Sequence, residues 1–204
     1  MAILFVLLGG YTSYLTFRYL QVKQQLAQLA VQNEESGYLI ELGENKVSAT
    51  NEKRLLQYES EGIMLDPGIE IRNEGEHYLL KEIIEQHNGN MVVLRYSDVH
   101  CQTCVDDQIK ILKGIKEVIG NDNIMILATY RNRKDFVIFK RMNQLAEMNI
   151  YQVDALDIPA DALGTPYLFI LDKNRQIRHL FIVDSESPVL SEEYYKVIIQ
   201  RYFS

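Results

Sequence analysis

Cys101 and Cys104 are the two cysteines of the 204-residue chain, and only two residues separate them. A pair at this spacing can cycle between a dithiol and a disulfide, or it can supply half of a zinc site. A zinc site needs two more ligands, but the sequence has no second cysteine pair and its four histidines are scattered. We therefore expect no metal here, and an inert buried pair is the other alternative to redox chemistry.

The pair lies between a predicted central strand and the helix that follows it. The strand is the nearly continuous apolar run Met91–Tyr96, which is typical of a strand covered on both faces. The helix carries an apolar stripe with helical spacing and ends before Gly120. A helix N-terminus presents free N–H groups and partial positive charge, which stabilise a thiolate. We therefore expect Cys101 to attack a disulfide and Cys104, one turn inside the helix, to resolve the intermediate.

The rest of the body alternates predicted strands and helices. Helical crossovers require the early strands to be parallel, whereas a hairpin around Asp172–Gln176 requires a late antiparallel pair. The fold class is therefore α/β, with a mixed central sheet flanked by helices. The other predicted strands are Ile69–Ile71, Ile124–Thr129, Ile150–Val153, Tyr167–Leu171 and Ile177–Val183, and the other predicted helices are a stripe from Tyr78 to Ile84, Asp135–Met148 and a last helix that opens at Ser191.

With these elements in place, the body resembles the thioredoxin-like superfamily, and especially its membrane-anchored TlpA/ResA-like thiol-disulfide oxidoreductases. The resemblance depends on the strand Met91–Tyr96, the motif Cys101–Cys104 and the segment Gly164–Asp172, and it covers residues 62–204. In that family a cis-proline begins the strand that faces the cysteines, and Pro166 matches it. A cis bond there would leave the backbone of Thr165 free to pair with an extended substrate. The resemblance thus implies a thioredoxin-like fold with Thr165 and Pro166 as substrate-binding residues.

The activity that the resemblance implies is disulfide exchange with protein thiols and disulfides, without a cofactor. It favours the reducing direction, which requires an upstream thiol electron donor. His100 occupies the position where family members usually have an aromatic residue, and the chain has no Trp. A protonated His100 would favour the Cys101 thiolate, whereas a neutral surface histidine would have no such effect.

Two other functions are compatible with this fold. A peroxiredoxin-like peroxidase has a Pro and a Thr ahead of its reactive cysteine, and both are missing from Tyr96–Cys101. A binding module would hold a metal such as copper, or a protein partner, without turnover. The copper-delivery relatives space their cysteines one residue further apart, so the spacing here argues against that function.

The first 61 residues differ in character from the body. Residues 1–20 are apolar with no charge before Arg18, and we expect a transmembrane anchor there rather than a buried core helix. Residues 21–61 are expected to form a helical stalk and connector. Within it, the pattern indicates a short strand at Tyr38–Leu42 and a helix at Glu52–Ser60.

Charge and spacing suggest where the protein resides and what it contacts. The net charge of −7 argues against a nucleic-acid partner. The resemblance places the catalytic domain in the periplasm, although Arg18 and Lys23 follow the apolar segment and, counted literally, would put the body in the cytoplasm. A heptad-like seam from Leu15 to Leu29 would permit a weak dimer through the stalk, and a helix resting on its own domain fits equally well.

Overall fold

A computed structural model of the chain describes residues 18, 21, 23, 24, 28, 37, 38, 40–87, 89–184 and 187–204. The chain divides into two compact units, Met1–Asn51 and Glu52–Ser204. Apart from Arg18, the predicted anchor lies outside the described residues, and so do the apolar positions of the heptad-like seam. No helix in the described part of the chain is long and apolar enough to cross a membrane.

The described part of the first unit is helical. Residues 40–51 form a continuous, solvent-exposed helical run, and Tyr38 is helical as well. The strand predicted at Tyr38–Leu42 is therefore wrong. A strand needs a neighbouring strand for its main-chain hydrogen bonds, whereas a helix satisfies them within its own segment. The predicted helix at Glu52–Ser60 is confirmed at the start of the second unit.

The second unit contains seven strands within its described residues, and they form one sheet in the order β2-β1-β5-β4-β3-β6-β7. The strands are β1 Glu70–Asn73, β2 Glu76–Leu79, β3 Met91–Ser97, β4 Ile124–Thr129, β5 Asn149–Val153, β6 Tyr167–Leu171 and β7 Ile177–Ile182. The helices are α2 Leu80–His87, α3 Gln102–Ile119, α4 Arg133–Met142 and α5 Pro188–Tyr202, with short 3-10 helices η1 Asn121–Asn123 and η2 Pro159–Leu163.

The sheet is mixed, as the sequence predicts. Strands β3, β4 and β5 are parallel neighbours joined by the crossover helices α3 and α4. Strand β6 pairs antiparallel with the other edge of β3, and β7 continues the hairpin beyond it. Because β5-β4-β3 progresses in one direction across the sheet, right-handed crossovers put both connecting helices on the same face.

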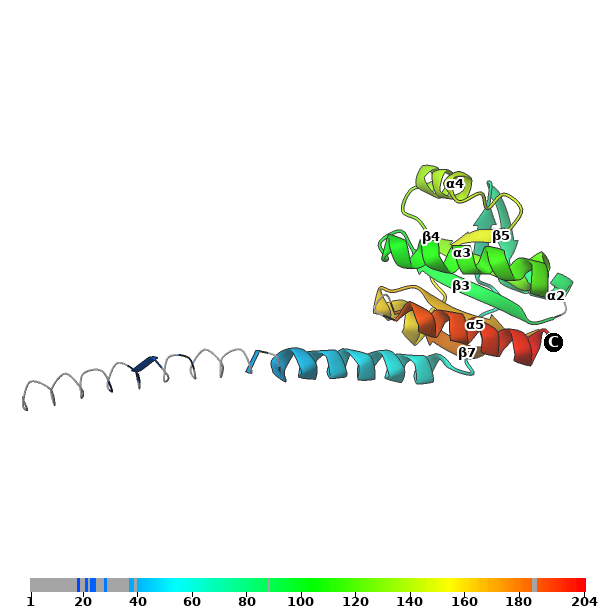
Figure 1. The fold of residues 1–204 in the computed structure, drawn as a ribbon. Coiled ribbons are helices and arrows are strands. Elements are labelled where there is room, and N and C mark those ends of the chain that lie inside the picture. The colour runs from blue at the N-terminus through cyan, green and yellow to red at the C-terminus, as the bar shows by residue number, and fades with distance from the viewer. Residues whose placement is uncertain are drawn as a thin grey trace, which may run out of the picture. The chain divides into compact units, whose positions relative to one another are not determined.

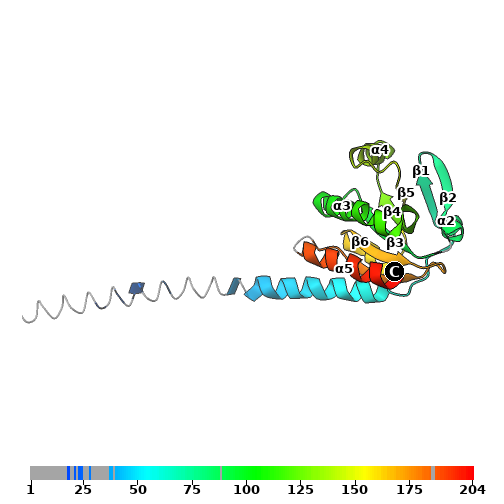
Figure 2. The same cartoon turned by 45° about the vertical axis from the view of Figure 1, so that its right-hand side comes forward.

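Two apolar cores sandwich the sheet. One face packs against α3, α4 and α5 through buried residues that include Leu112, Phe136 and Ile198. The other face packs against α2, η2 and the preceding loops, with Leu65 and Ile84 among its buried members. Figures 1 and 2 show α3 and α5 side by side along their face of the sheet, in agreement with their mutual contacts. The central strand β3 is buried along almost its whole length, which leaves only its carboxyl end free to present a site.

Three predicted element boundaries are wrong. Tyr78 belongs to β2 rather than to a helix, because a turn at Glu74 and Gly75, both with positive φ, folds β2 back onto β1. Helix α4 ends at Met142, six residues before the predicted end at Met148. The helix cannot continue through Gln144, because this residue adopts a left-handed φ of 49°. Helix α5 begins earlier than predicted, with Pro188 in its first turn, where a missing N–H costs nothing.

Candidate active site

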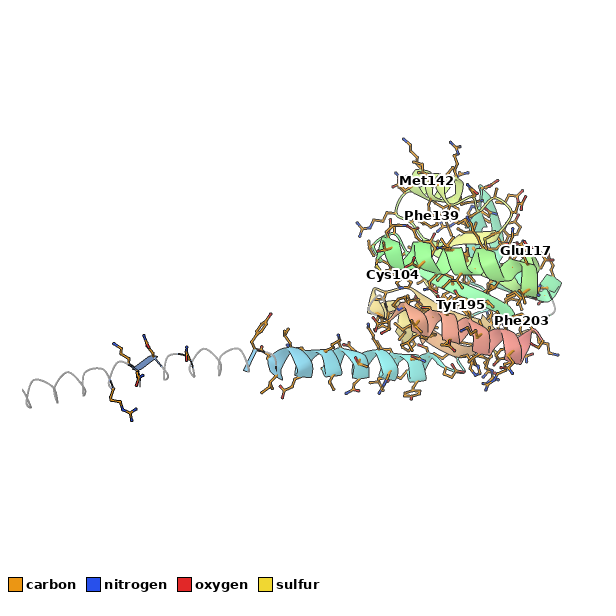
Figure 3. The ribbon with its side chains drawn as sticks, viewed as in Figure 1. Cys104, Glu117, Phe139, Met142, Tyr195 and Phe203 are labelled. Atoms are coloured by element: carbon orange, nitrogen blue, oxygen red, sulfur yellow. A yellow bond between two sulfur atoms is a disulfide. The ribbon has the colours of Figure 1, made fainter. Side chains whose placement is uncertain are left out.

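The cysteine pair occupies the N-terminus of α3, directly after the carboxyl end of β3. Cys101 is the N-cap residue of the helix, and the main-chain N–H of Cys104 lies 3.3 Å from its Sγ. The two residues form a disulfide, with their Cα atoms 5.3 Å apart. Figure 3 shows Cys104 at one end of α3 and Glu117 at the other. The pair therefore has the placement that the sequence predicts.

The two cysteines differ in exposure. Cys101 is solvent-exposed, and the hydroxyl of Thr103 lies 3.4 Å from its Sγ. Cys104 is only 8% exposed, because it faces the apolar core between α3 and the sheet. A sulfur at an exposed helix N-terminus can reach a large substrate and is stabilised there as a thiolate. A shielded sulfur one turn further along can react within the protein.

His100 precedes the motif and is half-buried. Its Nδ1 accepts a hydrogen bond of 3.1 Å from the main-chain N–H of Ser97. Burial and then the nearby Arg95 guanidinium lower the pKa of His100, although Asp161 and Asp98 act in the opposite direction. Both observations favour the neutral ring over the protonated form. A role for His100 in tuning the cysteines stays a prediction.

Pro166 lies at the same end of the sheet as the cysteines, which follow the carboxyl end of β3. Arg95 near the end of β3 pairs with Tyr167 at the start of β6, so Thr165 and Pro166 precede β6 where β3 ends. No peptide bond among the described residues is cis, so the expected cis bond at Pro166 is wrong. The trans form is the default even before proline, by roughly 0.5–1 kcal/mol. The Pro166 carbonyl accepts a hydrogen bond from Val183, and the substrate-binding role of Thr165 and Pro166 stays a prediction.

A buried ion pair beside the site was missed by sequence reasoning. Arg95 is 5% exposed, and its Nε lies 3.3 Å from Oδ1 of Asp161 in η2. The same carboxylate accepts hydrogen bonds of 2.7 Å from the Tyr167 hydroxyl and from the Leu156 main chain. An arginine inside the apolar run Met91–Tyr96 was the available signal, because a buried charge requires a partner. Nothing in the sequence pointed to Asp161 as that partner.

In the described part of the chain, α3 borders a smaller and a larger surface hollow. The smaller, of about 450 Å³, lies between α3 and α5 and has Cys104 in its lining. The larger, of about 760 Å³, lies between α3 and α4 and has no cysteine in its lining. Its lining is mainly basic: Lys113, Lys116, Arg133, Lys140 and Arg141, with Glu74 and Glu147 as the acids. Of these two hollows, the smaller one has a member of the cysteine pair in its lining.

The fold and the site together define a thioredoxin-like α/β protein, in which a cysteine pair opens the helix after the central strand. No family model and no curated protein matches the sequence. Among solved structures, the chain is similar to a thiol:disulfide interchange protein from Bacteroides sp., with 12% identity, 67% of this chain and 90% of that chain covered, and a TM-score of 0.46.

Two further solved structures show the same kind of similarity. The thioredoxin domain of a thiol-disulfide oxidoreductase from Bacteroides vulgatus has 12% identity, with 66% of this chain and 96% of that chain covered and a TM-score of 0.44. Reduced Prx3 from Vibrio vulnificus has 13% identity, with 65% and 97% covered and a TM-score of 0.45.

Proposed function

We propose that the protein is a thiol-disulfide oxidoreductase that exchanges disulfides with protein substrates through Cys101 and Cys104. The observation that carries the proposal is the disulfide between an exposed N-cap cysteine and a shielded cysteine one turn later. This asymmetry gives the pair one sulfur for the substrate and one for resolution.

In the reducing direction, the Cys101 thiolate attacks one sulfur of a substrate disulfide. A bond forms between Cys101 and that sulfur, the substrate disulfide breaks, and the released substrate thiolate takes a proton from solvent. The Cys104 thiolate then attacks Cys101 Sγ, which releases the second substrate thiolate and closes the Cys101–Cys104 disulfide. Two electrons pass to the substrate, so the described disulfide is the oxidised product of the cycle. A thiol donor must return two electrons before the next cycle.

The cellular setting belongs to the same proposal. Residues 1–20 would anchor the protein in a membrane, residues 21–61 would serve as stalk and connector, and residues 62–204 would act in the periplasm. The apolar first segment and the resemblance to anchored oxidoreductases support this arrangement. The same resemblance supports reduction of substrates as the working direction.

The proposal is tested by insulin-disulfide reduction with dithiothreitol as the electron donor. We expect the wild-type protein to accelerate the reaction, Cys101→Ser to lose all acceleration, and Cys104→Ser to accumulate mixed disulfides that mass spectrometry detects. The reduction potential of the pair, measured in glutathione buffers, then sets the direction. A pair that cannot cycle between dithiol and disulfide would contradict the proposal, and peroxide turnover that matches thiol oxidation would replace it with a peroxidase.

A further inference from the structure

The hollow between α3 and α5 has a buried glutamine, Gln108, in its lining. Gln108 lies one helical turn after Cys104 on α3 and lines the same hollow. It is 3% exposed, and its Nε2 donates a 3.1 Å hydrogen bond to Oγ of Ser191 on α5, which is 1% exposed. The amide oxygen of Gln108 is buried and has no hydrogen-bond partner among the described residues.

A buried acceptor without a hydrogen-bond donor lowers the stability of the folded protein. Leaving a buried polar group without a hydrogen bond costs roughly 1–3 kcal/mol. Ser191 accepts the hydrogen bond from Nε2 of Gln108, so in this arrangement the amide oxygen is the atom that lacks a partner among the described residues. Gln108 therefore brings a buried, unpartnered acceptor to the lining of the hollow.

The charges around the hollow select the kind of donor. Of the four charged side chains in its lining, three are acidic, namely Asp107, Asp184 and Glu192, and one is Lys110. Asp107 and Glu192 are exposed on α3 and α5, so the carboxylates approach the hollow from both helices. Lys and Arg side chains carry only N–H donors and a positive charge, so a buried acceptor with carboxylates around it suits either of them.

The position of the hollow relates this binding site to the redox reaction. Cys104 is in its lining, and Gln108 lies seven residues after Cys101, which is about 10 Å along the helix at about 1.5 Å per residue. A substrate is joined to Cys101 by the mixed disulfide, and its extended chain spans about 3.3 Å per residue. A residue three positions from the substrate cysteine can therefore reach the hollow.

We propose that this hollow is a specificity site for a basic residue next to the reactive cysteine of the substrate, with Gln108 as its hydrogen-bond acceptor. The inference depends on the proposed function and adds to it a substrate class: polypeptides with Lys or Arg close to the disulfide. Asp107 and Glu192 attract the cation, and Ser191 positions the Gln108 amide.

The test uses the full-length reduced protein and three short peptide disulfides that differ only at the third residue after the cysteine, which is Lys, Gln or Glu. Second-order rates are divided by those of dithiothreitol with the same peptide, which removes the effect of the charge on the intrinsic reactivity of the disulfide. We expect the normalised rate for the Lys peptide to exceed that for the Glu peptide at least about tenfold, as for a hydrogen bond to a charged group.

Variants assign the preference to the hollow. Gln108→Met keeps the shape without the acceptor and should lose most of the Lys preference, whereas Gln108→Glu adds a carboxylate and should increase it. Asp107→Asn should weaken the preference, and Asp106→Asn is the matched control, because Asp106 neighbours it on α3 but is not part of the lining. Circular dichroism of each variant checks that the fold is retained.

The outcomes separate this inference from the proposed function. Equal normalised rates for the Lys and Glu peptides, with normal disulfide exchange, would overturn the specificity site and leave the function standing. An unchanged preference in both Gln108 variants would overturn the role of Gln108. Failure to exchange any of the three peptides, with a pair that does not cycle, would instead overturn the proposed function.

Discussion

The two cysteines of the site differ in their exposure to solvent. Cys101 has the helix N-terminus and solvent around it, whereas the apolar core encloses Cys104. This difference arises within a single turn, because Cys101 caps the helix and Cys104 begins its inward-facing stripe. Asp106 is exposed and accepts a hydrogen bond from Gln102, so its negative charge lies beside the motif. There it disfavours a thiolate at Cys101, whereas the helix N-terminus favours one.

His100 gives a pH dependence that can be measured. Its pKa is lowered in the folded protein, so below about pH 6.5 the unfolded chain binds more protons at this residue than the folded one. The stability that this residue contributes is therefore present above the unfolded pKa and lost as the pH falls through 6.5 towards the folded pKa. We expect the free energy of unfolding of the oxidised protein in urea to fall less between pH 7.5 and 5 in His100→Gln than in the wild type.

The control for this prediction is Val99→Ala, at an exposed neighbour that does not titrate. It should shift the free energy of unfolding by the same small amount at each pH. An identical pH dependence in the wild type and in His100→Gln would show that the fold does not hold the ring neutral.

At the scale of elements, the Arg95–Asp161 ion pair joins three of them. Arg95 lies on β3, Asp161 on η2, and the Tyr167 hydroxyl on β6 donates to the same carboxylate. Arg95 also donates a hydrogen bond of 2.7 Å to the Tyr96 carbonyl. The cluster therefore fixes η2 and the start of β6 next to the end of the strand that leads to the cysteines.

Breaking this buried pair should cost much more than breaking an exposed one. Asp161→Asn leaves the Arg95 guanidinium buried without its counter-charge, and we expect a loss of about 3 kcal/mol in the free energy of unfolding. The matched variant Asp154→Asn removes the partner of Arg72, where the carboxylate is 87% exposed, and should cost less than about 1 kcal/mol. Urea unfolding at pH 7.5 measures both.

The double variant Arg95→Met/Asp161→Asn refines this prediction. Because it also removes the charge of Arg95, while the asparagine oxygen remains as an acceptor for the Tyr167 hydroxyl or the Leu156 main chain, it should be more stable than Asp161→Asn alone. If Asp161→Asn and Asp154→Asn lowered the free energy of unfolding equally, burial would not strengthen the Arg95–Asp161 ion pair and the prediction would be wrong.

At the scale of the whole molecule, the sheet-containing unit begins before its first strand. The Ser60 hydroxyl is buried and accepts a hydrogen bond of 3.0 Å from the Ala160 main chain. The Glu61 carboxylate accepts hydrogen bonds of 2.9 and 3.0 Å from the main chain of His179 and Leu180. These contacts connect the end of the helical segment, at Ser60 and Glu61, to η2 and to β7.

A pair of fragments tests this organisation. We expect the fragment that begins at Glu52 to unfold in one cooperative transition and to exchange disulfides at the rate of the full chain. The fragment that begins at Ile63 loses the groups that satisfy Ala160, His179 and Leu180, and its free energy of unfolding should fall by at least about 2 kcal/mol. Equal stability of the two fragments would show that the residues before Ile63 do not contribute to this unit.

Local patterns predicted much of the fold because they act over a few residues. The strand β3 and the end of α3 at Gly120 are both confirmed. A strand buried on both faces appears in the sequence as a continuous apolar run, and a helix end appears as a glycine after the last apolar position. The end of α4 could not be predicted in this way. The stripe continues to Leu145, which is fully buried, but a left-handed residue places it in the core without a helix.

The amino-acid sequence by itself determined the cysteine spacing, its place at a helix start after a buried strand and the mixed character of the sheet. These features depend on neighbouring residues and on hydrophobic periodicity. Only the tertiary structure decided that Asp161 partners Arg95 and that Ser191 holds Gln108 beside Cys104. Residues 66 and 83 positions apart meet in these pairs. Their pairing depends on how the layers pack, and no local pattern records that.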